Sequence, residues 1–237
     1  MTSITRGQYR AAFQKEQEVK YPTVDAIERE TGYALDYKWL WEAASVLACP
    51  VKVNPPNWQH GRVIYATLRQ YVNSEPETPI CCVDVGTAKG FSALCAARAL
   101  HDSQTPGAVY SCDVIDPLER TERNSIADCT APSTVPELLA AWPTLTRRVK
   151  LEKGTGVSLL KSGLSRVHFA FLDGKHKYEA VQEELGLLSR RQQKGDIVIA
   201  DDLQVSGVER AVTERADYSL RIVTLLRHRR HAIMTRR

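Results

Sequence analysis

The sequence predicts an α/β protein with a Rossmann-like, doubly wound and mostly parallel sheet. From residue 80 onward, short apolar segments of strand length alternate with helical patterns. A glycine-containing loop follows the first of these strands, and acidic residues follow the ends of later ones. Because ligands of open α/β sheets bind beyond the carboxyl ends of the strands, the functional site is expected at that edge.

A helical extension or cap is predicted for residues 1–53, ahead of a main domain at 54–237. The extension has no strand pattern. Its aromatic segment 37–41 (YKWLW) suits either packing onto the main domain, which we favour, or a cap over a small-molecule pocket. Helices are predicted here over residues 5–19, 23–31 and 35–48.

The main domain is predicted to end in an antiparallel hairpin, because two β-rich pieces at 220–226 and 231–235 flank a tight basic link. Residues 116–133, punctuated by Pro, Ser and Thr, are expected to be irregular and to contribute to the substrate pocket or to an oligomer contact. The other predicted strands are 80–85, 109–112, 149–152, 167–172 and 196–200, and the predicted helices are 59–72, 92–101, 135–142 and 177–190.

Composition indicates an ordinary globular protein, with 43% hydrophobic and 25% charged residues. No run approaches the roughly 18 apolar residues of a membrane span, the polar N-terminus lacks a secretory pattern, and the six cysteines show no CxxC pair. We therefore expect reduced thiols, a cytoplasmic location and no membrane partner.

The net charge of +4 is mild, and the basic cluster near the C-terminus lacks interleaved aromatics, which disfavours nucleic acid as a partner. A homo-oligomer is left open.

The loop Asp84-Val-Gly86-Thr-Ala-Lys-Gly90 ends the first predicted strand and turns into a helix. Its glycines allow positive φ and let a ligand lie against bare main chain. The GxxxG spacing differs from GxGxxG, which disfavours the pyrophosphate of a dinucleotide. An acidic residue at position 84 would instead face the positive aminoacyl end of a sulfonium cofactor. The predicted cofactor-binding residues of this region are Asp84, Gly86, Thr87, Gly90 and Ser92.

Asp113 ends the next predicted strand, where a carboxylate can accept both hydroxyls of a ribose. S-adenosylmethionine is a nucleoside with a cationic end, and we therefore expect it as the cofactor. Gly154, after the third strand, and Asp173, after the fourth, complete the predicted cofactor site. The alternative is that the glycine loop is an ordinary turn between a strand and a helix.

Three acidic residues, Asp173, Asp201 and Asp202, follow two strands that are predicted to be adjacent. Carboxylates drawn together repel one another, and a hard divalent cation between them makes the arrangement favourable. The sequence therefore predicts a Mg²⁺ or Mn²⁺ site. In the alternative, Asp173 caps the following helix and the other two lie in a solvated loop.

His176, three residues after Asp173, is the predicted catalytic base, because its ordinary pKa lies near neutral. Lys175 and Lys177 are the alternative bases.

Together, Asp84-x-Gly86-x3-Gly90, Asp173-Gly-x-His176-x-Tyr178 and Asp201-Asp202 resemble the metal-dependent class I S-adenosylmethionine O-methyltransferases, which include catechol and macrolide-sugar O-methyltransferases. The resemblance covers roughly residues 54–210, and the last two motifs are closer to the sugar-modifying branch. It implies that Asp173, Asp201 and Asp202 bind magnesium and that His176 is the base.

The resemblance also implies that residues 54–61 close over cofactor and substrate. One departure follows the third strand, where the family often presents a polar side chain to the adenine. This chain has Gly154-Thr-Gly-Val there.

The leading hypothesis is metal-assisted methyl transfer from S-adenosylmethionine to a hydroxyl of a small diol-like substrate, a sugar or a phenol. A nucleic-acid 2′-O-methyltransferase is the second hypothesis, motivated by the basic C-terminus. Such enzymes use a lysine after the strand that here ends in Asp201-Asp202, which argues against it. A non-catalytic cofactor-binding or scaffold protein is the third.

Overall fold

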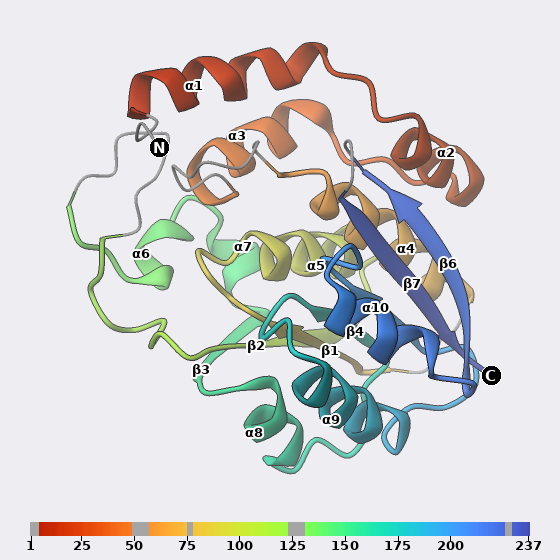
Figure 1. Ribbon diagram of the computed structural model, residues 1–237. Coiled ribbons are helices and arrows are strands. Elements are labelled where there is room, and N and C mark those ends of the chain that lie inside the picture. Colours follow the sequence, from red (N-terminus) through yellow and green to blue (C-terminus); the bar gives the residue numbers. More distant parts are fainter. Residues whose placement is uncertain (1–4, 49–56, 75–77, 123–130, 226–228) are drawn as a thin grey trace.

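A seven-stranded sheet forms the centre of the computed structural model, which describes residues 5–48, 57–74, 78–122, 131–225 and 229–237. Its strands are β1 (Ile80–Val85), β2 (Gly107–Asp113), β3 (Val149–Lys153), β4 (Phe169–Leu172), β5 (Ile197–Ala200), β6 (Tyr218–Thr224) and β7 (Arg230–Arg236). The strand order is β3-β2-β1-β4-β5-β7-β6 (Figure 1). Strands β1 to β5 pair in parallel, and β7 runs antiparallel to both β5 and β6. The predicted fold class is confirmed.

Helices cover both faces of the sheet (Figure 1). Helices α4 (His60–Ser74) and α5 (Phe91–Asp102) lie on one face, and α8 (Gly156–Lys161), α9 (Tyr178–Ser189) and α10 (Ser206–Thr213) lie on the other. Each face has its own hydrophobic cluster. Val198 and Ile199, neighbours in β5, belong to different clusters, because successive residues of a strand point to opposite faces. This two-sided burial explains why the central strands β4 and β5 are apolar throughout.

The N-terminal helices form an outer layer over the α4 side of the sheet (Figure 1). They are α1 (Arg6–Lys15), a 3-10 turn at Glu16–Glu18, α2 (Pro22–Thr31) and α3 (Tyr37–Leu47). Trp41 of α3 stacks on Phe13 with ring centroids 4.2 Å apart and meets Trp58 edge-on. These side chains belong to the same cluster as α4 and α5, so segment 37–41 packs onto the main domain. The domain boundary at residue 53 stays a prediction.

Four segments differ from the sequence prediction. The helix predicted over 135–142 ends early, as α6 (Val135–Leu138), and a second short helix, α7 (Pro143–Thr146), follows the predicted segment. Trp142 lies outside the helical region because the following proline disfavours it there. The helix predicted over 5–19 gives way to the 3-10 turn after residue 15. Helices α8 and α10 were not predicted.

The predicted C-terminal hairpin is confirmed, with β6 and β7 paired from Tyr218↔Arg236 to Thr224↔Arg230. Residues 226–228 of its link lie outside the described residues, as does much of the segment predicted to be irregular, where Thr121 bridges Ser133. Free thiols occur at four described cysteines, namely Cys81, Cys82, Cys95 and Cys112. None of the described helices has the length and apolar character that crossing a membrane requires.

Candidate active site

Two pockets open side by side at the carboxyl edge of the parallel strands. The first, here the β2–β3 pocket, has a volume of about 490 Å³ and is lined by residues that follow β1, β2, β3 and β4, and by Glu184 of α9. The second, the α3 pocket, has a volume of about 330 Å³ and lies between the loop after β1 and the end of α3. Gly86 and Asp173 line both pockets. The two cavities therefore meet at one point of the sheet edge.

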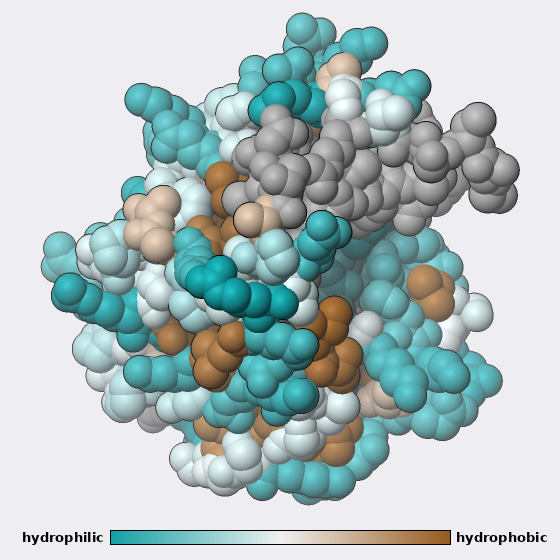
Figure 2. All heavy atoms as spheres, turned by 90° about the vertical axis from the view of Figure 1, so that its left-hand side faces the viewer, coloured by the Kyte–Doolittle hydropathy of each residue, from teal (hydrophilic) through white to brown (hydrophobic). Residues whose placement is uncertain are grey.

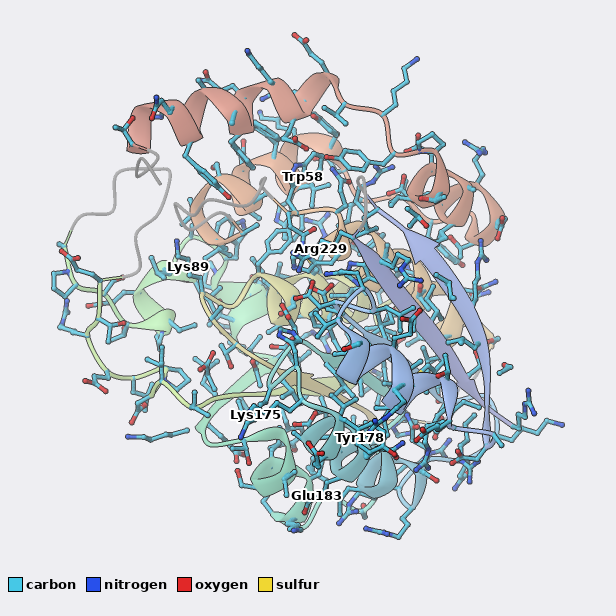
Figure 3. All side chains as sticks on the ribbon, viewed as in Figure 1. Trp58, Lys89, Lys175, Tyr178, Glu183 and Arg229 are labelled. Atoms are coloured by element: carbon cyan, nitrogen blue, oxygen red, sulfur yellow. The ribbon has the colours of Figure 1, made fainter. Side chains whose placement is uncertain are left out.

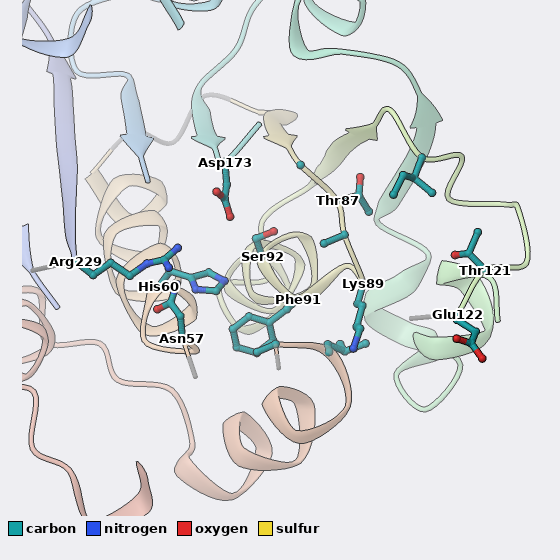
Figure 4. A pocket seen from close by; sticks show the side chains of 15 residues that line it. Asn57, His60, Thr87, Lys89, Phe91, Ser92, Thr121, Glu122, Asp173 and Arg229 are labelled. Atoms are coloured by element: carbon teal, nitrogen blue, oxygen red, sulfur yellow. The ribbon is translucent and has the colours of Figure 1, made fainter. Parts of the chain in front are cut away.

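The α3 pocket gathers side chains from distant parts of the chain (Figure 4). Asp173 points into it from the end of β4, with Arg229 and His60 on one side and Thr87 and Lys89 on the other. Its far wall comes from the end of the N-terminal extension, Leu47 and Ala48. The end of the extension thus borders a pocket, through residues that follow the aromatic segment 37–41.

The loop after β1 has the backbone that its glycines allow. Gly86 has φ of +96°, and a Cβ there would lie 2.2 Å from the Asp173 carbonyl oxygen. The amides of Gly86 and Thr87 both donate to the Cys112 carbonyl, which ties the loop to β2. Gly90 has φ of +89° at the start of α5. Only glycine fits at position 86, because a side chain would collide with main chain of the neighbouring strand.

Asp84, the residue before the last of β1, is a buried carboxylate, 2% exposed, and lines neither of the two pockets itself. Its Oδ2 accepts a 2.5 Å hydrogen bond from Ser111, whose hydroxyl also lies 2.6 Å from that of Thr87. Oδ1 has no hydrogen-bond partner among the described residues. Burial raises the pKa of Asp84 to about 6, although the hydroxyls of Ser111 and Ser92 act in the opposite direction. A buried carboxylate without a cation is suited to receive one from a ligand.

Asp113 and Gly154 lie together in the β2–β3 pocket, as predicted. One Asp113 carboxylate oxygen accepts from the amide of Ala88 at 2.8 Å and the other from Ile115 at 3.0 Å. The Gly154 amide donates to the carbonyl of Asp113. Asp113 therefore fixes both loops that border the pocket, and each of its oxygens keeps a further lone pair for a ligand.

Apolar side chains edge this site. Val114 and Ile115 are 68% and 54% exposed, and they line the β2–β3 pocket and the α3 pocket respectively. Figure 2 shows the side of the molecule on which this segment runs, where hydrophobic side chains interrupt a largely hydrophilic surface. Such residues provide a surface that a flat ring can cover.

The acidic cluster assembles around His176. Ligand atoms of Asp173, His176 and Asp202 all lie within 4.8 Å of one another. The His176 Nε2 atom is 3.2 Å from Asp173 Oδ1 and 3.4 Å from Asp202 Oδ2. The hydrogen bond to Asp173 raises the pKa of His176. Burial, with the nearby charge of Asp201, raises the pKa of Asp173. Both shifts favour the protonated form of the group concerned.

Asp201 is close enough to act on the charge of Asp173 but does not belong to that group of ligand atoms, and it already has cationic and polar partners. Its Oδ2 is 2.7 Å from Arg229 Nη2, its Oδ1 is 3.2 Å from His231 Nε2, and Oδ1 also accepts from the amide of Asp202. Although burial raises the pKa of Asp201, His231 and Arg229 lower it more strongly, so that it falls below the usual range. Of the three predicted metal ligands, the structure therefore brings two together and ties the third to Arg229.

The predicted bases also separate in space. His176 lies beside Asp173, whereas Lys175 lines the β2–β3 pocket. Figure 3 shows Lys175 on the side of α8 and α9, and Arg229 on the opposite side, toward α3. Lys177 is the N-terminal flanking residue of α9.

Sequence reasoning missed two charged residues of the site, Arg229 and Glu184. Arg229 was treated as part of a basic hairpin link, yet its guanidinium lies 2.7 Å from Asp201 and 3.2 Å from Asp202. Glu184 had a usable signal. It falls on the same helical stripe as the apolar residues Val181, Leu185 and Leu188, which predicts a buried position.

The segment predicted to close over the site is described only from residue 57. Asn57 and His60 line the α3 pocket, and the amide oxygen of Asn57, turned toward Arg229, accepts from its Nε and Nη2 at 2.9 and 3.0 Å. Trp58 is buried against the aromatic side chains of the extension. Residues 54–56 lie outside the described residues.

Comparisons with known proteins assign the chain to a family. No protein of curated function matches the chain in sequence. In structure it is similar to the Bacillus cereus O-methyltransferase crystallised with S-adenosylhomocysteine (14% identity, TM-score 0.57, covering 98% of this chain and 100% of that one).

Two further solved structures share the fold. The O-methyltransferase NovP is 16% identical, with a TM-score of 0.58 over 84% of this chain and 98% of its own. A methyltransferase from Geobacter sulfurreducens is 17% identical, with a TM-score of 0.52 over 92% and 90%. The expected resemblance to class I methyltransferases is thereby confirmed. A family model described as a methyltransferase domain matches residues 83–203, just over half of the sequence, and the chain therefore belongs to this methyltransferase-domain family.

Proposed function

We propose that this protein transfers the methyl group of S-adenosylmethionine to a hydroxyl oxygen of a small acceptor, such as a sugar or a phenol with neighbouring oxygens. The observation that carries the proposal is the shared wall of the two pockets. Gly86 and Asp173 line both, so a cofactor in the β2–β3 pocket and an acceptor in the α3 pocket would meet there. Reacting groups held at such a junction need little further ordering.

The cofactor fits the polar groups that the chain leaves available. The cationic amino end of the cofactor would lie at Asp84, whose buried Oδ1 has no hydrogen-bond partner among the described residues. The ribose would lie at Asp113, in the same pocket as Gly154. Main chain at Gly86 would border the methionyl part, since no side chain stands in the way.

Methyl transfer itself needs a base and an aligned acceptor. The acceptor oxygen forms a bond to the methyl carbon while the carbon–sulfur bond breaks, and that electron pair stays on sulfur. The hydroxyl proton passes to His176, whose Nε2 atom lies 3.2 Å from Asp173 Oδ1 and whose pKa is raised by that contact. His176 is the proposed base, and Lys175, in the other pocket, is a weaker candidate.

A divalent cation, Mg²⁺ or Mn²⁺, fits the donor atoms of Asp173 and Asp202 beside His176. Such an ion would bind acceptor oxygens and lower the pKa of the hydroxyl. Asp201 was also predicted as a ligand of this ion. Its charge is already compensated by Arg229, so its role as a ligand stays a prediction.

The α3 pocket supports a small molecule as acceptor. Its volume, about 330 Å³, lies within the range of small-molecule sites. A nucleic-acid acceptor is disfavoured because three arginines of the basic C-terminal stretch pair with acids of the same chain. These pairs are Arg229 with Asp201 and Asp202, Arg230 with Glu209, and Arg236 with Asp217.

The test is a transfer assay with radiolabelled S-adenosylmethionine across a panel of sugars, catechols and oligonucleotides, with Mn²⁺, Mg²⁺ or chelator. We expect labelled small-molecule product that falls at least about 100-fold in Asp173→Asn and remains in Glu179→Gln, an exposed change in the first turn of α9. If chelator leaves product formation unchanged, only the role of the cation is refuted and the rest of the proposal stands. A wild-type protein that does not bind S-adenosylhomocysteine would refute the whole proposal and leave the scaffold hypothesis.

A further inference from the structure

Glu184 is a buried carboxyl that the proposed chemistry does not use. It lies in the middle of α9, only 4% exposed, on the apolar side of the helix that packs under the sheet. Its side chain nevertheless reaches the wall of the β2–β3 pocket. An acidic group at this depth is costly, so its position calls for a physical reason.

One glycine makes room for this carboxyl. A Cβ at Gly156 would lie 2.4 Å from Glu184 Oε1. The Glu184 oxygen therefore occupies the space that a side chain at position 156 would fill. The chain segment after β3 offers glycine there, and α9 supplies the polar group from below.

Nothing within the described part of the chain satisfies the carboxyl. No hydrogen bond or ion pair of Glu184 occurs among the described residues, whereas its neighbour Glu183 pairs with Lys161 at 2.8 Å. Burial raises the pKa of Glu184 to about 7, and the charge of Glu183 contributes. A buried acceptor without a donor costs free energy that a ligand N–H can recover.

The rest of the pocket indicates which ligand group arrives there. Asp113 offers carboxylate oxygens to a ribose, and the exposed Val114 beside it offers an apolar surface to the attached base. A purine that covers Val114 would lie in the same pocket as the Glu184 carboxyl. An amino group on the purine edge is an N–H donor, and an oxo group is not.

We propose that Glu184 accepts a hydrogen bond from the exocyclic amino group of the cofactor's adenine and selects an aminopurine over an oxopurine. This inference rests on the proposed function, because it takes S-adenosylmethionine as the occupant of the β2–β3 pocket. With a 6-oxopurine, the carbonyl oxygen would face the carboxylate and both acceptors would lose a partner.

The experiment compares two ligands by calorimetry, S-adenosylhomocysteine and its 6-oxopurine counterpart S-inosylhomocysteine. Wild type is expected to prefer the adenine compound by at least about tenfold. In Glu184→Gln the amide can turn to serve either base, so the preference is expected to shrink to about twofold or less. Glu183→Gln, one residue away on the exposed side of α9 (Figure 3) and 51% exposed, is the matched control and should keep the wild-type preference.

Thermal unfolding without ligand separates recognition from folding. Glu184→Gln should be at least as stable as wild type, because it removes a buried, unpaired acid. An unchanged preference in Glu184→Gln, or equal affinity of wild type for the two ligands, would overturn the inference while leaving methyl transfer intact. Failure of wild type to bind either ligand would overturn the proposed function and this inference with it.

Discussion

Asp84 and Asp201 are two buried carboxylates near the carboxyl ends of their strands, one within the last two residues of β1 and the other just after β5, yet their surroundings are opposite. Asp84 has only hydroxyl donors, and burial raises its pKa to about 6. Asp201 has Arg229 and His231 beside it, and despite its burial its pKa is lowered. The β1 half of the sheet edge thus keeps a charge uncompensated, which suits a cationic ligand. The β5 half is neutralised within the chain.

Gly86 lines both pockets, and among the variants proposed here we expect Gly86→Ala to have the largest effect on stability and binding. The added Cβ would lie 2.2 Å from the Asp173 carbonyl at a φ of +96°. We expect a loss of about 3–4 kcal/mol in the free energy of unfolding and at least about a 100-fold loss of S-adenosylhomocysteine affinity.

Gly163→Ala is the control for that change, because it has a φ of +104° and open space around its Cβ. It should cost about 1 kcal/mol and leave binding unchanged. Equal losses in the two variants, measured by urea unfolding, would mean that backbone strain alone explains Gly86.

Removing the cation of the β5 half comes next. Arg229→Met leaves Asp201 buried without its guanidinium, and we expect a loss of about 3 kcal/mol in the free energy of unfolding. Arg230→Met, one residue on, breaks only a partly exposed pair with Glu209 and should cost less than about 1 kcal/mol. If the two variants unfold at the same urea concentration, Asp201 does not depend on Arg229.

Asp84→Asn makes the opposite test in the β1 half. The ligand-free protein should be at least as stable as wild type, because a buried uncompensated acid is removed. Affinity for S-adenosylhomocysteine, measured by calorimetry, should fall by about 10- to 100-fold, since a charged hydrogen bond to the amino group is lost. A destabilised variant with unchanged affinity would reverse the roles assigned to the two carboxylates.

The pH dependence of binding should show the same difference with a smaller effect. Because burial raises the folded pKa of Asp84 to about 6, any stability that it contributes to the ligand-free protein is present at low pH and lost as pH rises through about 6. Binding of a cationic amino group requires the ionised acid, so affinity should rise with pH over the same range. Calorimetry at pH 5 and pH 7.5 should differ by about tenfold for wild type and by less for Asp84→Asn. A pH effect of equal size in both proteins would assign it to another group.

The sequence was sufficient to place the residues that end strands. Asp84, Asp113 and Asp173 occupy the predicted edge because alternating strands and helices fix where each strand stops. The same argument predicted that Asp202 and His176 lie close to Asp173, and ligand atoms of the three residues do lie within 4.8 Å of one another.

What the sequence did not predict depends on tertiary register. The pairing of Arg229 with Asp201 follows from the antiparallel β5–β7 ladder, whose alignment no local pattern defines. The place of Glu184 in the pocket could not be predicted, because the sequence does not show that α9 brings its side chain to Gly156. Trp142 lies outside a helix because Pro143 follows it, and Pro143 begins the next short helix instead.

The most direct test of the contrast between Asp84 and Asp201 is a crystal structure with S-adenosylhomocysteine bound. The account predicts the amino group of the ligand at Asp84 Oδ1, its ribose at Asp113 and its sulfur facing Asp173, with Asp201 still paired to Arg229. A ligand whose amino group lies at Asp201, after Arg229 has moved away, would contradict it.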